Sequence, residues 1–342
     1  MTGPRKVERT GAVMMADIAA LAGVSESTVS RALAGNPLVA EKTRQLIAQL
    51  AKSHGYAVNP AARSLRRGNT QTIAVMIPLT HASRQHVSDA FFAEMLSSLA
   101  EALNERGYDL LFHRISADHG DWIGAPIQTR RADGVIIIGQ SLEHEAMNRA
   151  ALAGVPLVVW GAKLPNQHYV SVGVDNFQGG VLGTSHLLAR GRRRIAFLGD
   201  TRVPEVMERR RGYAQTLCDA GIDLDPGLEL QIQFGAEEAV QVLRDVVQAG
   251  RGIDGVVAAS DTLALSAIRE LTHSGLNVPK DVSVVGFDDI PLASYTLPPL
   301  TTIRQEIAPG AILLVEKLLA ILAGEPVESE QMSPTLIVRG SS

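Results

Sequence analysis

The sequence predicts a small all-α head at the N-terminus, followed by an α/β body built from two doubly wound lobes. Short amphipathic segments separated by turns occupy residues 15–54, and short apolar runs alternate with longer amphipathic segments from residue 72 onward. The chain has 342 residues, which is more than one compact core accommodates. Hydrophobic residues make up 46% and charged residues 20% of the chain, as in ordinary soluble globular proteins.

Three short helices are predicted in the head. Gly23 ends the first helix after about two turns, and Ser25 is placed to cap the second, with Thr28 three residues later. The segment 16–34 is therefore typical of a helix-turn-helix. The apolar positions that can meet in one small core are Ile18, Ala22, Val24, Val29, Leu33, Val39, Ile47 and Leu50.

The body alternates predicted strands with predicted helices. Continuous apolar runs suit strands that are buried on both faces, and the alternation predicts parallel sheets. About ten strands are many for one open sheet, so we expect two lobes that face a cleft, with ligands beyond the carboxyl ends of the strands. The predicted strands are 73–77, 109–113, 134–138, 157–160, 170–174, 195–198, 230–233, 255–259 and 282–286. The predicted helices include 93–106, 178–190, 209–220, 237–248 and 263–274.

Four segments are expected along the chain. They are a disordered tail (1–14), the helix-turn-helix head (15–58), a linker (59–70) and the body (71–342). The linker contains Asn59-Pro60, a helix-start signal, and Gly68 as a stop. Within the body, we expect one lobe over about 71–175 with 304–324, and the other over 176–303 with 325–342.

The composition also indicates the compartment. Cys218 is the single cysteine, so it can form neither an internal disulfide nor a cysteine zinc site, which fits a reducing cytoplasm. Residues 1–14 lack the apolar stretch of a signal peptide, and no run of about 18 apolar residues occurs. We therefore expect a cytoplasmic protein with no membrane partner.

Charge is distributed unevenly along the chain. The first 70 residues hold ten Lys/Arg and four Asp/Glu, a net charge of +6, whereas the remainder holds 22 and 32, a net charge of −10. This asymmetry indicates either a head that faces phosphates or a basic tail that is merely solvated.

The second predicted helix has the features of a DNA-reading helix. Its outer side carries Glu26, Ser27, Ser30 and Arg31, and such a helix fits the major groove with its N-terminal residues toward the base edges. The alternative is a plain helical hairpin with a glycine turn. The basic local charge and the linker that follows favour DNA binding.

Several motifs in the head, linker and body occur together in the order found in one known family. They are Asp17-Ile18-Ala19, Ala22-Gly23-Val24-Ser25, Thr28-Val29-Ser30-Arg31, Gly55-Tyr56, Asn59-Pro60-Ala61-Ala62-Arg63-Ser64-Leu65, Ser260-Asp261, Val278-Pro279 and Leu300-Thr301-Thr302-Ile303. Over residues 15–340 the chain resembles the lac-repressor/galactose-repressor (LacI/GalR) family of transcription regulators.

The resemblance implies roles on the DNA side. The base-reading positions match Glu26, Ser27 and Arg31, and the phosphate-contacting positions match Ser25 and Thr28. Residues 59–65, including Asn59 and Ala62, match a hinge helix that forms on operator DNA. Leu65 matches a leucine wedged into the minor groove; the alternative is a buried contact in an ordinary helix. At Ala40 the family usually has a capping Ser or Thr, whose loss costs about 1 kcal/mol.

The body resembles the periplasmic sugar-binding fold that the family uses as its sensor. The positions implied to contact an effector are Phe91, Phe92, Arg209, Phe234 and Asp261, with Asp175 and Gln305 as further candidates near the lobe crossings. One of the two adjacent phenylalanines is expected to belong to the core. Arg209 lies in a run of three arginines that would ordinarily be solvated, and Asp261 can also act as a helix N-cap.

The resemblance is incomplete in two places. After the strand 157–160 the family often has an acidic residue, whereas this chain has Trp160-Gly161, which makes Trp160 a candidate contact and leaves the ligand open. The loop 80–89 is longer than typical and forms either a cover for the cleft or a surface loop.

These features predict a repressor that binds a near-palindromic operator as a homodimer, or as a higher oligomer. A single recognition helix reads only a few bases, so useful specificity requires two heads. We expect a small-molecule effector in the cleft, either a sugar or, as the alternative, a purine-like corepressor.

Rival functions fit less well. The sequence has no G-x-G-x-x-G or phosphate-binding loop after the first strand, no metal-spaced histidines and no nucleophile elbow. We therefore expect no enzymatic activity, catalytic residues, cofactor or metal. A periplasmic sugar carrier would require a signal peptide and would not require residues 15–70, and a DNA binder without a sensor would not require the large body.

Overall fold

The computed structural model describes residues 13–56, 69–78, 89–115, 121–232 and 236–342. The chain divides into two compact units, residues 1–70 and 71–342. Within the described segments, the structure contains no helix with the length and apolarity that a membrane crossing requires.

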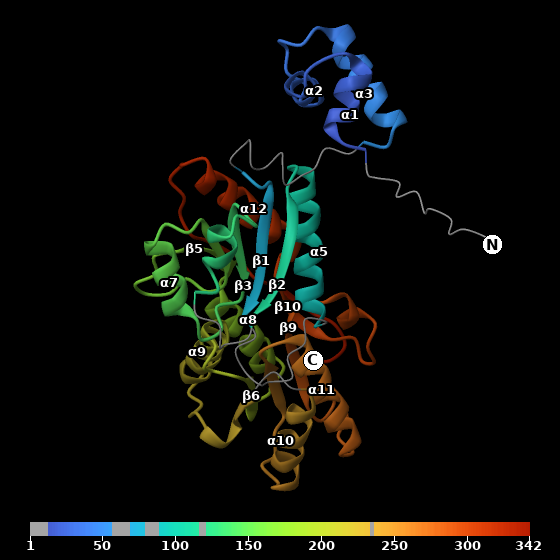
Figure 1. Cartoon of the computed structure of the whole chain (residues 1–342). Coiled ribbons are helices and arrows are strands. Elements are labelled where there is room, and N and C mark those ends of the chain that lie inside the picture. Colours follow the sequence, from blue (N-terminus) through green and yellow to red (C-terminus); the bar gives the residue numbers. More distant parts are fainter. Residues whose placement is uncertain (1–12, 57–68, 79–88, 116–120, 233–235) are drawn as a thin grey trace, which may run out of the picture. The chain divides into compact units, whose positions relative to one another are not determined.

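The head contains the three predicted helices, α1 (Met15–Ala22), α2 (Glu26–Leu33) and α3 (Glu41–Ser53) (Figure 1). Gly23 ends α1 in the left-handed region at φ 66°, where glycine has no Cβ to clash. The Ser25 hydroxyl caps α2 by accepting a hydrogen bond from the Thr28 backbone N–H at 3.3 Å. Ala40 gives α3 no side-chain cap. The fully buried side chains at the centre of the head are Ile18, Val29 and Ile47.

The first sheet of the body has six parallel strands. In spatial order they are β11 (Glu330–Met332), β5 (Val170–Val174), β4 (Leu157–Trp160), β3 (Gly134–Ile138), β1 (Thr72–Pro78) and β2 (Asp109–Ile115). Its helices are α5 (Ala90–Glu105), α6 (Ala125–Gln128), α7 (His144–Leu152) and α12 (Ile307–Leu322). Ile73 and Val75 of β1 pack with α5 and α12, whereas Ala74 and Met76 pack with α7, because successive strand residues point to opposite faces.

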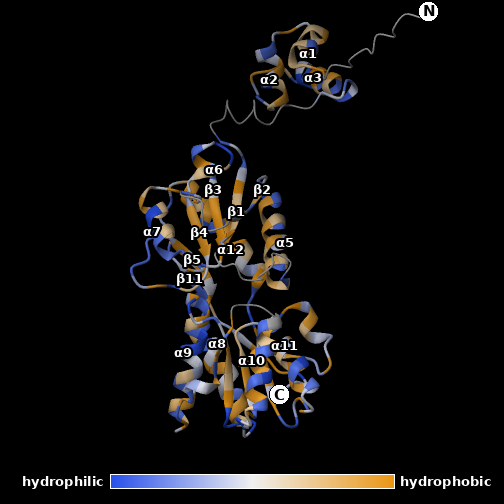
Figure 2. Ribbon diagram, turned by 60° about the horizontal axis from the view of Figure 1, so that its bottom comes forward, coloured by the Kyte–Doolittle hydropathy of each residue, from blue (hydrophilic) through white to orange (hydrophobic). Residues whose placement is uncertain are grey.

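The second sheet also has six strands, of which only β12 is antiparallel to its neighbour. In spatial order they are β12 (Thr335–Ile337), β10 (Thr301–Arg304), β9 (Ser283–Asp288), β8 (Gly255–Ala258), β6 (Ile195–Gly199) and β7 (Glu229–Gln231). Its helices are α8 (Asn176–Ala189), α9 (Pro204–Asp219), α10 (Ala236–Gln248) and α11 (Asp261–His273), with short 3₁₀ turns at Pro226–Leu228 and Pro291–Ser294. Figure 2 shows both sheets as predominantly hydrophobic layers.

The predicted fold class is confirmed: a helix-turn-helix head precedes two doubly wound α/β lobes. The nine predicted strands are present, and the structure adds β10, β11 and β12. One lobe assignment requires correction. Residues 325–342 were expected in the second lobe, but β11 pairs with β5 of the first sheet, where Met332 accepts a hydrogen bond from the Asp175 N–H at 2.9 Å. The chain consequently passes between the lobes after β5, after β10 and after β11.

Helices α8 and α9 approach each other at backbone distance through two glycines. A Cβ on Gly180 would overlap the carbonyl oxygen of Arg209, and a Cβ on Gly212 would overlap that of Phe177. Only glycine permits this approach, so the short spacing from Arg209 to Gly212 reflects helix packing. The same packing fixes the position of the Arg209 backbone.

We predict that Gly212→Ala destabilises the body by about 1–3 kcal/mol, since the added methyl group forces the two helices apart. Urea unfolding of the full chain, followed by the fluorescence of the body's tryptophans, measures the change. The control is Gln215→Ala, an exposed position on the same helix that should remain close to wild type. Equal stability of the two variants would contradict the close packing of α8 and α9.

Candidate functional site

Helix α2 presents the predicted DNA-reading side chains outward. Val29 and Ala32 face the core, whereas Glu26, Ser27 and Arg31 are exposed. At the start of the helix three hydroxyls form one cluster, in which the Ser25 Oγ lies 2.8 Å from the Ser27 Oγ and 2.9 Å from the Thr28 Oγ1. Helix α2 therefore combines a buried inner face with a polar outer face that carries Arg31.

Some of the predicted residues lie outside the described part of the chain. They are Asn59, Ala62 and Leu65 of the expected hinge, Phe234 of the expected effector site, and residues 80–88 of the long loop.

The aromatic residues of the first lobe divide between core and boundary. Phe92 is buried in the core, and Phe91 is only partly buried, with its ring centroid 5.3 Å from that of Phe92 and 6.4 Å from that of Trp160. Trp160 is itself buried and lies against Gly310 of α12, where a Cβ would overlap its ring. Of the three candidates, Phe91 is therefore the one whose ring is not enclosed in the core.

Arg209 is buried, in contrast to its two neighbours. Its Nε donates to the Asn176 Oδ1 at 2.8 Å, one Nη donates to the carbonyl oxygen of Ala259, and the guanidinium lies 3.6 Å from the centroid of the Phe287 ring. Arg210 and Arg211 instead form ion pairs with glutamates. Arg209 is therefore not part of a solvated charge run: its guanidinium is buried, and it has the partners that the burial of a guanidinium requires.

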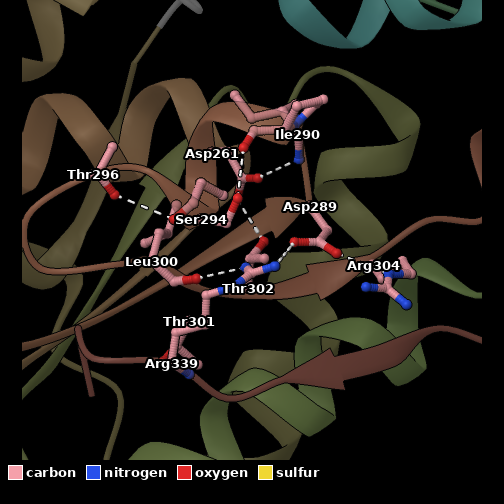
Figure 3. Close-up of polar contacts among 12 residues, drawn as sticks. Asp261, Asp289, Ile290, Ser294, Thr296, Leu300, Thr301, Thr302, Arg304 and Arg339 are labelled. Atoms are coloured by element: carbon pink, nitrogen blue, oxygen red, sulfur yellow. Dashed lines mark hydrogen bonds and ion pairs between the residues drawn. The ribbon is translucent and has the colours of Figure 1, made fainter.

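Asp261 lies at the first turn of α11, but it is not the N-cap. The cap is Ser260, whose hydroxyl accepts from the Leu263 N–H. Figure 3 shows the hydrogen bonds of the Asp261 carboxyl, whose Oδ1 accepts from the Thr302 Oγ1 at 2.5 Å and whose Oδ2 accepts from the Ile290 N–H at 2.9 Å. Burial raises the pKa of Asp261 to about 7, against the opposing effect of these hydrogen bonds.

The remaining two candidates have defined structural partners. Gln305 is buried and its Nε2 donates to the Asp288 Oδ1 at 2.6 Å. Burial raises the pKa of Asp288 well above its ordinary value, against the opposing charge of Arg209. Asp175 caps α8 by accepting from the Gln178 N–H at 2.9 Å.

Among the hydrogen bonds that join the lobes, two link residues far apart in the sequence. The Gln140 N–H, after β3, donates to the Glu205 Oε1 at 3.0 Å, and the Thr262 Oγ1 donates to the Asp89 Oδ2 at 3.0 Å. These contacts bring the carboxyl ends of the two sheets together. We call this region the interlobe boundary. Four of the predicted effector contacts lie in or next to elements that begin or end there: Phe91, Arg209, Asp261 and Gln305.

Sequence reasoning missed the residues that complete this boundary. They are Asp89, Gln140, Asn176, Glu205, Phe287 and Asp288. Glu205 was discoverable, because it lies four residues before Arg209 and hence on the same face of a helix. The others contact Arg209 or the opposite lobe from separate elements, which no local pattern reveals.

The boundary offers the chemistry of a binding site for a polar molecule. It combines an aromatic ring, a buried guanidinium and several buried carboxyl groups that accept hydrogen bonds. Among the residues that the structure describes, no group of three or more His, Cys, Asp or Glu side chains is arranged to hold a metal ion.

The raised pKa of Asp261 gives a pH-dependent prediction. The folded-state value of about 7 exceeds the ordinary value of 3.8, so this group stabilises the fold at low pH and loses that contribution as the pH rises through 7. The variant Asp261→Asn lacks this titrating carboxyl, so its stability does not fall in this way as the pH rises. The free energy of unfolding of the variant relative to wild type should therefore increase between pH 5 and pH 8 by about 1.4 kcal/mol or more, the equivalent of one pKa unit.

Urea unfolding at both pH values measures this difference. The control is Asp281→Asn, because hydrogen bonds from Asn277 lower the pKa of Asp281. That carboxyl is ionised throughout this pH range in the folded and unfolded chains, so its substitution should shift the unfolding free energy equally at both values. A constant offset for Asp261→Asn would contradict the assignment.

Comparison with known proteins identifies both parts of the chain. Residues 14–59 match the family model "Bacterial regulatory proteins, lacI family", and residues 184–342 match "Periplasmic binding protein-like domain". The transcriptional regulator CelR of Thermobifida fusca is 33% identical over 84% of this chain and 85% of its own length. The transcriptional repressor CytR of Escherichia coli is 31% identical over 98% of both chains.

Comparison with solved structures leads to the same family. The lac repressor dimer bound to operator and the anti-inducer ONPF is 25% identical, with a TM-score of 0.85 over 96% of this chain and 98% of that one. The complex of CelR with cellobiose is 29% identical, with a TM-score of 0.71 over 96% of this chain and 100% of that one. The family resemblance drawn from the sequence motifs is thus confirmed, and the chain belongs to the LacI family of bacterial regulatory proteins.

Proposed function

We propose that this protein represses transcription as a homodimer on a near-palindromic operator, under the control of a polar small molecule, a sugar, bound at the interlobe boundary. The observation that carries the proposal is the pairing, in one chain, of an exposed recognition helix with a buried guanidinium at the carboxyl ends of two parallel sheets. The family supplies the first function, sequence-specific regulation of transcription. The site in the body supplies the means of control.

On the DNA side, Glu26, Ser27 and Arg31 would read base edges from the major groove. The cluster formed by the hydroxyls of Ser25, Ser27 and Thr28 supports phosphate contacts at the start of the helix, where N–H groups also favour anions. We further propose that residues 59–65 form a hinge helix on the operator, with Leu65 as the wedge in the minor groove. As a DNA-binding regulator, the protein would act in the cytoplasm.

The dimer follows from the specificity that repression requires. One short helix contacts too few bases to select an operator among many competing sites, and two heads on a palindrome multiply the discrimination. The lac repressor, which matches this chain over nearly its whole length, was solved as a dimer on its operator.

In the body, a sugar is the effector class that the comparisons favour. CelR was solved with cellobiose, and a LacI-family regulator from Enterococcus faecium, 26% identical, was solved with bound ribose. In this chain, Phe91 would stack on a sugar face, and Arg209 and Asp261 would contact its hydroxyl groups. Asp175, Gln305, Phe234 and the enclosed Phe92 and Trp160 would shape the surrounding wall.

Arg31→Ala is predicted to relax base preference. The operator is first selected from a random duplex pool with the full chain, and affinities for operator and random DNA are then compared by fluorescence anisotropy. Loss of a base contact should reduce the preference for operator over random DNA by about 1–3 kcal/mol. The control is Lys42→Ala, an exposed charge on α3, which should weaken both affinities alike. If Arg31→Ala weakened the affinities for operator and random DNA equally, a base-reading role for Arg31 would be contradicted.

Calorimetric titration of the full chain with neutral sugars and nucleobases tests the effector. We expect at least one sugar to bind, and Arg209→Lys to weaken it about tenfold or more, since a lysine lacks the fork of donors while keeping the charge. Arg211→Lys, whose residue pairs with Glu208 on the surface of the same helix, should bind like wild type. If no member of the panel binds the wild type, the sugar proposal fails; if only nucleobases bind, the alternative of a purine-like effector replaces it.

A further inference from the structure

Two consecutive aspartates at the end of β9 adopt backbone angles that side chains rarely take. Asp288 has φ 119° and Asp289 has φ 60°. Aspartate tolerates the left-handed region near φ 60° better than most residues, whereas φ 119° lies outside that region and is strained for any residue with a Cβ. Such a conformation persists only where the surrounding contacts hold it in place. We call these two residues the β9 corner.

The Asp289 carboxylate is held from two sides. Its Oδ2 accepts a hydrogen bond from the Arg304 Nε at 2.8 Å, and its Oδ1 accepts one from an Nη of Arg339 at 2.6 Å (Figure 3). The side chain of Asp289 is only 7% exposed, and the two guanidinium groups share this one carboxylate. We call the three side chains the Asp289 clamp. Its two arginines come from separate segments, the end of β10 and the chain after β12.

Arg339 is itself anchored. Its other Nη donates to the carbonyl oxygen of Leu300 at 2.8 Å, and its backbone N–H donates to the Thr301 Oγ1 at 2.9 Å. Two residues later, the buried Ser341 donates to the carbonyl oxygen of Val284 at 2.7 Å and accepts from the Thr301 N–H at 2.8 Å. The planar fork of Arg339 thus connects a fixed segment of chain to the β9 corner, which a single ammonium group could not do.

The β9 corner holds neighbours of the buried Arg209 guanidinium. The ring of Phe287, immediately before the corner, lies 3.6 Å from that guanidinium. The Asp288 carboxyl interacts with the same guanidinium and accepts a hydrogen bond from the Gln305 Nε2 at 2.6 Å. A change in the backbone of the corner would therefore displace two neighbours of Arg209 at once.

The corner also holds a neighbour of Asp261. Ile290, directly after the corner, donates its backbone N–H to the Asp261 Oδ2 at 2.9 Å. The Asp289 side chain hydrogen-bonds to neither Arg209 nor Asp261, because its two oxygens accept from the arginines of the clamp. Its influence on these two residues is consequently indirect and passes through the backbone.

We propose that Asp289 is a positioning residue of the effector site, whose carboxylate, held between Arg304 and Arg339, keeps the β9 corner in the conformation that orders the surroundings of Arg209 and Asp261. The proposal rests on the effector site proposed above and assigns the residues that preorganise it. A site that is ordered before binding loses less freedom when the ligand arrives, so the clamp contributes to effector affinity without touching the effector.

Substitution of Arg339 tests the clamp. The full chain is first titrated calorimetrically with neutral sugars, including cellobiose and ribose, and with nucleobases, and the tightest ligand is then used for every variant. Arg339→Ala should weaken that ligand about tenfold. Arg339→Lys keeps the ion pair with Asp289 but cannot also reach the carbonyl of Leu300, so it should recover affinity to within about threefold of wild type.

Substitution of Asp289 separates the clamp from the backbone angle. Glycine adopts φ 60° without strain, so Asp289→Gly permits the native backbone but no longer holds it there. The affinity of Asp289→Gly should fall about tenfold or more. If the residue mattered only because its backbone angle must be tolerated, Asp289→Gly would instead bind like wild type.

Arg244→Ala is the matched control. Arg244 also makes two hydrogen bonds to one carboxylate of the second lobe, that of Glu270, both at 3.0 Å. Its loss should lower the midpoint of thermal unfolding as the loss of an ion pair does, yet leave effector affinity unchanged, because this pair joins α10 to α11. Thermal unfolding of every variant verifies that the body is folded at the temperature of titration.

Each outcome decides the role of Asp289. The role is overturned, while the effector site stands, if Arg339→Ala or Asp289→Gly binds like wild type, if Arg339→Lys loses as much affinity as Arg339→Ala, or if Arg244→Ala weakens binding equally. If no ligand of the panel binds the wild type, the effector site itself fails, and the positioning role fails with it.

Discussion

The burial of the Arg209 guanidinium is the constraint on which the interlobe boundary depends. A charge withdrawn from water needs acceptors, counter-charges and a polarisable surface, and these come from three parts of the second lobe: Asn176 of α8, Ala259 after β8, and Phe287 and Asp288 of β9. The glycine contact between α8 and α9 brings the arginine backbone close enough for its side chain to reach them. The packing of α8 against α9 therefore also determines the position of Arg209 at the interlobe boundary.

Polar contacts at the same boundary join the lobes. Glu205 with Gln140, and Thr262 with Asp89, are single hydrogen bonds, each contributing only about 0.5–3 kcal/mol. Together with the three chain crossings, and with the apolar contact of Val174 with Phe287 and Ile303, they hold the lobes. Contacts of this strength suit an equilibrium between lobe arrangements that a ligand can shift.

Sequence patterns predicted the fold well, and they singled out some of the residues that lie at the interlobe boundary. Strands such as β3 and β9 were found because they are continuous apolar runs, whereas β10, β11 and β12 are three or four residues long and rich in polar residues, as in Thr301–Arg304. Arg209 was singled out by its spacing to Gly212, although the structure shows that the glycine serves helix packing. The pairing of β11 with the first sheet was not predictable, because three residues carry no signal of which lobe they join.

The sequence did not predict the contacts of the site for the same reason: the contacting residues are far apart along the chain. A sequence motif records neighbours along one element, and it therefore singled out Asp261 but left open a capping role that belongs to Ser260. The partners of Asp261 come from Ile290 and Thr302, which are 29 and 41 residues away along the chain. Burial could not be foreseen for Trp160 either, since its ring fills the space left by Gly310 in a helix much later in the sequence.

Coupling between effector and operator requires contacts from both lobes. A ligand changes an equilibrium only by the difference in its affinity for the two arrangements, so one that touched only Arg209 and Asp261 of the second lobe would bind both alike and shift neither. A ligand that also stacked on Phe91 would discriminate between the arrangements, because Phe91 belongs to the first lobe. On the proposed site, the residues that would read the effector are also those that would transmit its binding, and a change that improves affinity within one lobe alone would not improve control.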